Sequence, residues 1–222
     1  MKRIESDKLR QLLKVYFIMG SVNCRKTPAK VLSEAIAGGV TMFQYREKGT
    51  GALTSEARFN LGRRLQKICL ANGVPFIVND DIDLAIALDA DGIHVGQEDL
   101  CALAIRQLLG DHKIIGVSAH SLAEARQAIA DGADYLGIGP IYPTSSKDDA
   151  RAVQGTKIIE ELRNSGITIP LVGIGGITEH NAAPVIAAGA DGISIISAIA
   201  GAEDTEEAAK RFVQIVEASN PL

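Results

Sequence analysis

Hydrophobic and polar positions follow two alternating patterns along the chain. Short runs rich in Val, Ile and Phe, typical of buried strands, are each followed by a longer stretch in which apolar residues recur at helical spacing. Gly or Pro marks most of the junctions. The predicted strands are residues 15–19, 41–46, 75–79, 92–95, 114–117, 135–139, 171–175 and 193–197. The predicted helices are residues 28–37, 54–72, 81–88, 100–109, 121–130, 156–165, 179–188 and 205–218.

Eight strand-and-helix units predict an α/β protein with a single (β/α)8 TIM barrel over residues 1–222. An open doubly wound sheet usually has fewer units. Residues 7–13 are expected to form an N-terminal helical cap. Several helix-to-strand joints have similar sequences, in which Gly is expected to end the helix in a left-handed conformation. These joints are Gly38-Gly39, Ala90-Asp91-Gly92, Asp131-Gly132-Ala133-Asp134 and Gly189-Ala190-Asp191-Gly192.

The composition narrows the class of protein. Hydrophobic residues make up 46% and charged residues 23% of the chain, which suits a soluble globular enzyme and argues against disorder. The net charge of -4 argues against a nucleic-acid partner, and no apolar run reaches the length of a signal peptide or a membrane span. Cys24, Cys69 and Cys101 lack paired spacing, which argues against disulfide and zinc frameworks and favours a cytoplasmic location. Homo-oligomer formation stays open.

Candidate site residues lie at the carboxyl ends of the predicted strands, because (β/α)8 enzymes place their active sites there. At the second strand, period-two alternation turns Gln44, Arg46 and Lys48 to one face. Two cations and an amide suit a multiply charged anion such as pyrophosphate. The alternative is a solvated strand end without a ligand.

The third and fourth predicted strands end in acidic residues. Asp80 and Asp81 follow the third strand, and Glu98 and Asp99 follow the fourth. Carboxylates facing a cationic pair suit a Mg²⁺ ion that bridges protein and diphosphate, with Asp80 and Asp99 as the preferred ligands. Asp81 is better explained as a helix N-cap, and Glu98 can be a charge in the first turn of a helix.

Polar residues also follow the fifth and sixth strands. Ser118 can hydrogen-bond a substrate, but no third partner supports a serine nucleophile. His120 either acts at the site or packs ahead of a helix. Residues 139–147 form either a lid or a solvated loop, and the hydroxyl side chains beside Lys147 favour a lid over an anionic substrate.

Glycine-rich residues 173–177 follow the seventh strand, and Ser197 ends the eighth. Loops at these positions commonly bind phosphate in (β/α)8 barrels through backbone amides. The predicted site therefore has a metal-assisted diphosphate region and a separate monophosphate region. This arrangement predicts that two anionic substrates are joined with loss of diphosphate.

Six motifs occur in an order that is highly specific. They are residues 44–48, Val78-Asn79-Asp80-Asp81, His94-Val95-Gly96-Gln97-Glu98-Asp99, Gly116-Val117-Ser118, Gly139-Pro140-Ile141-Tyr142-Pro143-Thr144 and residues 173–177. Through these motifs the chain resembles the thiamine phosphate synthase family over nearly its whole length.

The resemblance implies a (β/α)8 transferase of thiamine biosynthesis. Such an enzyme joins 4-amino-2-methyl-5-hydroxymethylpyrimidine diphosphate to hydroxyethylthiazole phosphate, or its carboxylated form, and gives thiamine phosphate. The pyrimidine diphosphate ionises to a resonance-stabilised cation with release of pyrophosphate, and the thiazole nitrogen then attacks that cation. One Mg²⁺ per active site is implied, with Asp80 and Asp99 as its ligands.

The resemblance also implies a role for each matching residue. The implied pyrimidine diphosphate contacts are Gln44, Tyr45, Arg46, Glu47, Lys48, Asn79, Ser118 and Lys147. Those expected to act in catalysis are Arg46, Lys48, Ser118 and Lys147. The implied thiazole phosphate contacts are Thr144, Ser145, Ser146, Gly176, Ile196 and Ser197. Tyr45 stands where the family often has Phe, Ser146 stands where it often has Thr, and Glu47 is expected to point away from the anion.

Three other functions fit parts of the pattern. A thiazole tautomerase of the same barrel family would expel no diphosphate and would leave Arg46, Asp80 and Asp99 unexplained. An aldolase-like enzyme would use Lys48 as a Schiff-base lysine, with its pKa lowered by Arg46. A non-catalytic phosphate-binding barrel would need anion pockets but no metal-binding carboxylates.

Overall fold

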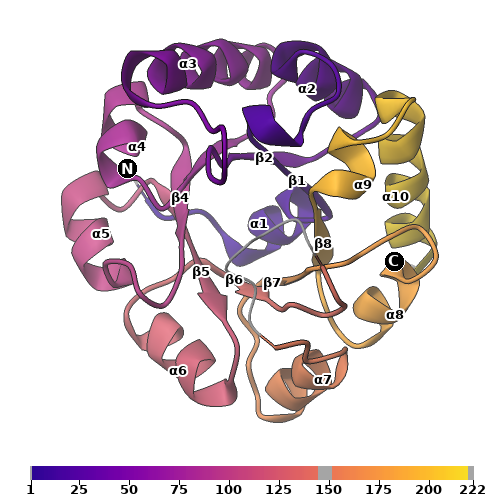
Figure 1. Ribbon diagram of the computed structural model, residues 1–222. Helices are drawn as coiled ribbons and strands as arrows, with labels where there is room; N and C mark the ends of the chain where they lie inside the picture. Colours follow the sequence, from indigo (N-terminus) through magenta and orange to yellow (C-terminus); the bar gives the residue numbers. More distant parts are fainter. Residues whose placement is uncertain (1, 145–151, 220–222) are drawn as a thin grey trace.

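The computed structural model describes residues 2–144 and 152–219 and consists of a closed barrel of eight parallel strands (Figure 1). Each strand pairs with the next in sequence, and β8 closes the barrel against β1. The strands are β1 Val15–Met19, β2 Met42–Tyr45, β3 Phe76–Asn79, β4 Gly92–Val95, β5 Ile114–Ala119, β6 Tyr135–Ile138, β7 Leu171–Ile174 and β8 Gly192–Ile195. The predicted (β/α)8 barrel is confirmed.

The helices surround the barrel, except for α1, which lies across its centre in Figure 1. They are α1 Ser6–Leu12, α2 Pro28–Ala37, α3 Ser55–Ala71, α4 Ile82–Leu88, α5 Ala102–Leu109, α6 Leu122–Ala130, α7 Lys157–Asn164, α8 Ala182–Ala187, α9 Ser197–Ala200 and α10 Thr205–Ser219, with a 3-10 turn η1 at Ser21–Asn23. None of the helices in the described ranges is long and apolar enough to cross a bilayer.

Helix α9 is a difference from the sequence-based prediction, which extended the eighth strand to Ser197. The backbone of Ile196 has φ -113° and ψ -89°, which lies outside the strand region. The strand ladder therefore ends at Ile195, and Ser197 begins the helix.

Alternation along the strands produces two apolar clusters. The outward residues, such as Phe43 and Ile93, pack beneath the surrounding helices. The inward residues, such as Tyr135 and Ile77, pack together inside the barrel, where Leu9 of α1 joins them. The predicted N-terminal cap therefore contributes apolar side chains to the barrel interior.

A repeated hydrogen-bond pair, here called the strand-start clamp, joins the strands in twos. Each clamp joins two residues: one just before an even-numbered strand, and a partner at the start of the preceding strand. The first residue donates its backbone N–H to the carbonyl of the partner. The side chain of the first residue accepts the backbone N–H of the partner. The pairs are Thr41 with Val15, Asp91 with Phe76, Asp134 with Ile115, and Asp191 with Leu171. The four side-chain bonds measure 3.0, 2.8, 2.8 and 2.8 Å in that order.

Two clamps also anchor the N-terminal segment. The Asp134 carboxylate, whose side chain is 4% exposed, binds Arg3 at 2.7 Å and Arg106 at 2.6 Å. In the same way, Asp191 binds Arg163 at 2.7 Å and Arg10 of α1 at 2.5 Å. These ion pairs connect α1 and the residues before it to the strand starts.

Replacing Asp134 by Ala is expected to lower the free energy of unfolding more than Asp91→Ala. Loss of Asp134 leaves the guanidinium of Arg106, whose side chain is only 10% exposed, without its carboxylate, and breaking such a pair typically costs about 3–5 kcal/mol when it is fully buried. Loss of Asp91 leaves one unpaired amide, that of Phe76, at about 1–3 kcal/mol. Urea unfolding of both variants measures the difference as a shift in midpoint at unchanged slope. Equal losses would contradict the proposed contribution of the arginines.

Candidate active site

A cavity of about 290 Å³ opens at the carboxyl ends of the strands. Residues of β3 to β8 and of the loops after β2 to β8 surround it. Its lining is Arg46, Lys48, Asn79, Asp80, His94, Gly96, Gln97, Glu98, Asp99, Ser118, His120, Gly137, Gly139, Pro140, Thr144, Ile174, Gly175, Gly176, Ile177, Ser194, Ile195, Ile196 and Ser197. Most of the site residues predicted from the strand ends therefore meet around one cavity.

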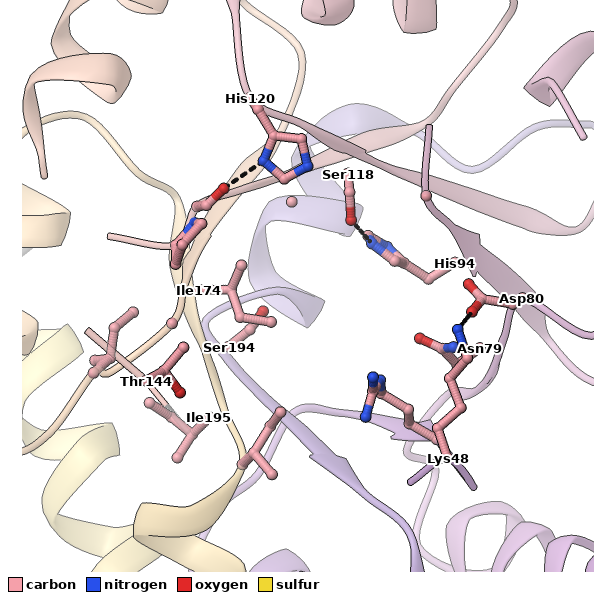
Figure 2. Close-up of a pocket in the computed structure, with 18 of the residues that line it drawn as sticks. Lys48, Asn79, Asp80, His94, Ser118, His120, Thr144, Ile174, Ser194 and Ile195 are labelled. Carbon is pink, nitrogen blue, oxygen red and sulfur yellow. Dashed lines mark hydrogen bonds and ion pairs between the residues drawn. The ribbon is translucent and has the colours of Figure 1, made fainter. Parts of the chain in front are cut away.

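The end of β2 contributes the cationic side. Arg46 and Lys48 both line the cavity, and the ammonium of Lys48 forms an ion pair with the carboxylate of Asp80 (Figure 2). Gln44 points inward but is only 1% exposed and is absent from the lining. Its amide Nε2 instead donates to the hydroxyl of Tyr16 at 2.7 Å.

Tyr45 and Glu47 point away from the cavity, as alternation requires. The Tyr45 hydroxyl donates to the carbonyl of Arg58 at 3.0 Å. The Glu47 carboxylate accepts the backbone amides of Ser21 at 2.8 Å and Leu53 at 2.9 Å. Glu47 therefore joins the loop after β1 to the loop after β2, and it holds in place the segment that carries Lys48.

Two carboxylates face the cationic side. Asp80 has φ +60°, a left-handed conformation that costs a non-glycine residue about 1–3 kcal/mol and is concentrated at functional sites. Asp99 accepts the amide of Gly96 at 2.7 Å. Burial raises the pKa of Asp99, the amide of Gly96 opposes this effect, and the adjacent Asp80 carboxylate raises the pKa further. The two carboxylates thus lie close enough to repel each other.

This donor set fits Mg²⁺. The ion prefers carboxylate oxygens, usually takes only one or two from the protein, and keeps waters or substrate phosphate oxygens at its other positions. No group of three or more His, Cys, Asp or Glu side chains that could hold a metal occurs within residues 2–144 and 152–219. Asp80 and Asp99 therefore suit an ion shared with a substrate better than a fully protein-bound ion.

The neighbouring acidic residues have different surroundings. Asp81 accepts the amide of Leu84 at 2.8 Å and forms an ion pair with Arg58, so it caps α4 as the alternative interpretation predicted. Glu98 lines the cavity beside Asp99. Asn79, at the end of β3, also lines it.

Ser118 and His94 meet at the cavity, where the histidine Nε2 lies 2.9 Å from the serine Oγ (Figure 2). His94 belongs to one of the motifs but was not among the predicted site residues. Its signal in the sequence was its place in an apolar strand, one residue before the strand end, at the same parity as Gly96.

His120 also lines the cavity. Its Nδ1 lies 2.5 Å from the carbonyl of Gly139, and because a carbonyl can only accept, Nδ1 carries the proton. Its backbone amide donates to Glu124 at 2.7 Å. The imidazole thus connects the end of β5 to the loop after β6.

The predicted monophosphate region lies across the cavity from Lys48. Thr144, Gly176, Ile196 and Ser197 line it, and Figure 2 shows Thr144 and Ile195 opposite Lys48 and Asp80. Gly176 has φ +63°, and a Cβ there would lie 2.3 Å from the carbonyl oxygen of Pro143, so the approach of these two loops requires glycine. Ser145, Ser146 and Lys147 lie outside the described residues.

Comparison with known proteins identifies the family. The sequence pattern of the thiamine monophosphate synthase family matches residues 15–199. A thiamine-phosphate synthase of Bacillus cereus (strain AH187) is 59% identical over 222 residues, covering 100% of both chains, and one of Bacillus thuringiensis (strain Al Hakam) is 58% identical over 219 residues, covering 99% of this chain and 100% of the relative. The structure of a thiamine phosphate pyrophosphorylase from Pyrococcus furiosus superimposes with a TM-score of 0.85 at 37% identity, covering 95% of this chain and 98% of that one. The chain therefore belongs to the thiamine monophosphate synthase family.

Proposed function

We propose that this transferase joins 4-amino-2-methyl-5-hydroxymethylpyrimidine diphosphate to hydroxyethylthiazole phosphate, or its carboxylated form, and releases pyrophosphate and thiamine phosphate. The observation that carries the proposal is the division of the cavity. Lys48 lies with Asp80 and Asp99 on one side, and Thr144 lies on the opposite side (Figure 2). Arg46 and Gly176 also line the cavity. Two differently equipped anion regions suit two phosphorylated substrates.

The diphosphate is proposed to bind beside Arg46 and Lys48. Arginine offers paired donors to phosphate oxygens, and lysine offers a mobile point charge. Asn79 and Ser118, which line the cavity, are proposed to contact the same substrate, as are Gln44, Tyr45, Glu47 and Lys147 by family resemblance. Because the side chains of Tyr45 and Glu47 point elsewhere, any contact from them would come through the backbone.

Asp80 and Asp99 would hold one Mg²⁺ per site. When bound, the ion supplies charge neutralisation for the leaving diphosphate. The residues of the chain then act mainly by positioning and electrostatics. Arg46 and Lys48 offset the negative charge that develops as the methylene carbon–oxygen bond breaks, and Ser118 orients the pyrimidine.

Bond formation needs no protein base. The amino group of the pyrimidine donates electrons into the ring as pyrophosphate leaves, and the thiazole nitrogen attacks the resulting methylene cation with its own lone pair. We propose that Thr144, Gly176, Ile196 and Ser197 hold the thiazole phosphate, together with Ser145 and Ser146, so that its nitrogen faces that carbon. The pocket would also limit access of water, which competes for the same cation.

The tautomerase alternative is less well supported. A tautomerase would use the thiazole phosphate region but would have no need for the Lys48–Asp80 ion pair or the neighbouring Asp99.

The three free cysteines fit a reducing compartment, and we propose that the enzyme acts in the cytoplasm on small phosphorylated molecules. A homo-oligomer remains compatible with the fold.

Purified protein is expected to release pyrophosphate when it receives both substrates and Mg²⁺. Removal of divalent ions with EDTA is expected to stop release, and an excess of Mg²⁺ to restore it, because the leaving charge is then balanced again. A coupled pyrophosphate assay measures the rate, and omission of the thiazole phosphate gives the control. Absence of release with substrates that a known synthase consumes would reject the proposed reaction.

Asp99→Asn is expected to lower kcat by about 100-fold or more, because it removes charge needed to hold the metal beside the leaving group. Asp83→Asn offers a matched control, since Asp83 is an exposed aspartate in the first turn of α4 and does not line the cavity. Steady-state kinetics and thermal unfolding of both variants provide the measurements. Near-normal turnover of a well-folded Asp99→Asn enzyme would show that Asp99 is not a metal ligand.

A further inference from the structure

A chain of hydrogen bonds crosses the barrel interior and reaches the cavity. It begins at Gln44, whose Nε2 donates to Tyr16 at 2.7 Å, and continues between the hydroxyls of Tyr16 and Tyr135, 2.8 Å apart. The Tyr135 hydroxyl lies 3.0 Å from Nδ1 of His94, and Nε2 of His94 lies 2.9 Å from Ser118. Five residues on five different strands thus form one connected series, here called the interior relay.

Glycines on β5 and β6 make room for the interior relay. A Cβ at Gly116 would lie 2.1 Å from the ring of Tyr135, and one at Gly137 would lie 3.0 Å from the ring of His94. Tyr16 and Tyr135 are fully buried, with ring centroids 5.9 Å apart in an edge-to-face arrangement. Burial raises the pKa of both hydroxyls well above their usual range, so both keep the proton that the series requires.

The interior relay has a direction. An amide nitrogen can only donate, so Tyr16 accepts from Gln44. Among the described residues the Tyr135 hydroxyl is then the acceptor within reach of the buried Tyr16 proton, so Tyr16 donates to Tyr135. Tyr135 in turn donates to Nδ1 of His94, and a neutral imidazole that accepts at Nδ1 carries its proton on Nε2. His94 therefore donates to Ser118, and the hydroxyl proton of Ser118 is left to point elsewhere. Ser118 lines the cavity, so that proton is available to a ligand.

We propose that the interior relay sets the hydrogen-bond polarity of the pyrimidine subsite, with Tyr16, Tyr135 and His94 as positioning residues. It makes Ser118 a donor toward the cavity. Gln44, whose amide carries Oε1, is 1% exposed and absent from the cavity lining, so it acts as the buried start of the series. That Oε1 atom is buried and has no hydrogen-bond partner among the described residues. The inference rests on the proposed function, which places the pyrimidine at Ser118.

The polarity matches an aminopyrimidine. Its exocyclic amino group donates hydrogen bonds, and its neighbouring ring nitrogen accepts them. In the 4-oxo counterpart the pattern is reversed, because the exocyclic oxygen accepts and the ring nitrogen carries a hydrogen. A Ser118 hydroxyl held as a donor disfavours the 4-oxo ring, because the N–H of that ring cannot accept the Ser118 proton.

Calorimetric binding of two unreactive ligands tests the proposal. These are 4-amino-2-methyl-5-hydroxymethylpyrimidine monophosphate and its 4-oxo counterpart. The unmodified enzyme is expected to favour the amino compound by at least about tenfold. Tyr135→Phe, which breaks the interior relay at its centre, is expected to reduce this ratio by about tenfold, because His94 is then free to turn either tautomer toward Ser118. The double variant Tyr16→Phe with Tyr135→Phe is expected to have the same amino-to-oxo ratio as Tyr135→Phe alone, since one break already uncouples the two ends of the interior relay.

Ile77→Val provides the packing control. Ile77 lies in the same interior cluster as both tyrosines, but its side chain has no polar atom. This variant is expected to lose some stability and to keep the amino-to-oxo ratio. If Tyr135→Phe does not fold, His94→Gln replaces it, because a carboxamide can turn either its donor or its acceptor to Ser118 and is expected to reduce the ratio similarly.

The possible results separate the inference from the proposed function. A folded Tyr135→Phe enzyme that keeps the full amino-to-oxo ratio would overturn the interior relay while leaving the pyrimidine site intact. Equal reduction of the ratio by Ile77→Val would also overturn it, since packing would then be the cause. Failure of the unmodified enzyme to bind either pyrimidine would reject the proposed placement of the substrate, and with it the interior relay.

Discussion

The strand-start clamps are the constraint on which the rest of the structure depends. Each one joins two neighbouring strands by a reciprocal pair of hydrogen bonds, so the pairing of those strands cannot shift without loss of both. A shift of one residue would exchange the inward and outward faces of a strand. Register set at the amino ends therefore decides which side chains face the cavity at the carboxyl ends.

Counting from the clamps shows how the site is assembled. In every strand, the first and the third residues after the clamped position point inward. The first inward layer is Tyr16, Met42, Ile77, Gly92, Gly116, Tyr135, Val172 and Gly192. The second is Ile18, Gln44, Asn79, His94, Ser118, Gly137, Ile174 and Ser194. Six of the eight members of this second layer line the cavity, so they form its floor.

The sequence predicted the barrel and much of the cavity because both follow from local periodicity. Alternation placed Arg46 and Lys48 on the cavity side and Glu47 away from it, as the structure has them. The contribution of His94 was missed, because its partner Tyr135 stands 41 residues away and no local pattern joins them. Asp134 was noticed only as part of a turn, since its partners Arg3 and Arg106 come from separate elements.

Under the proposed function, the cavity separates its charged groups from its neutral ones. Arg46 and Lys48 stand where the diphosphate would leave, whereas the two members of the interior relay that line the cavity, His94 and Ser118, are neutral in the hydrogen-bond pattern of the relay. This division suits a dissociative reaction, because fixed cations near the leaving oxygens favour charge separation, and cations near the ring would oppose it.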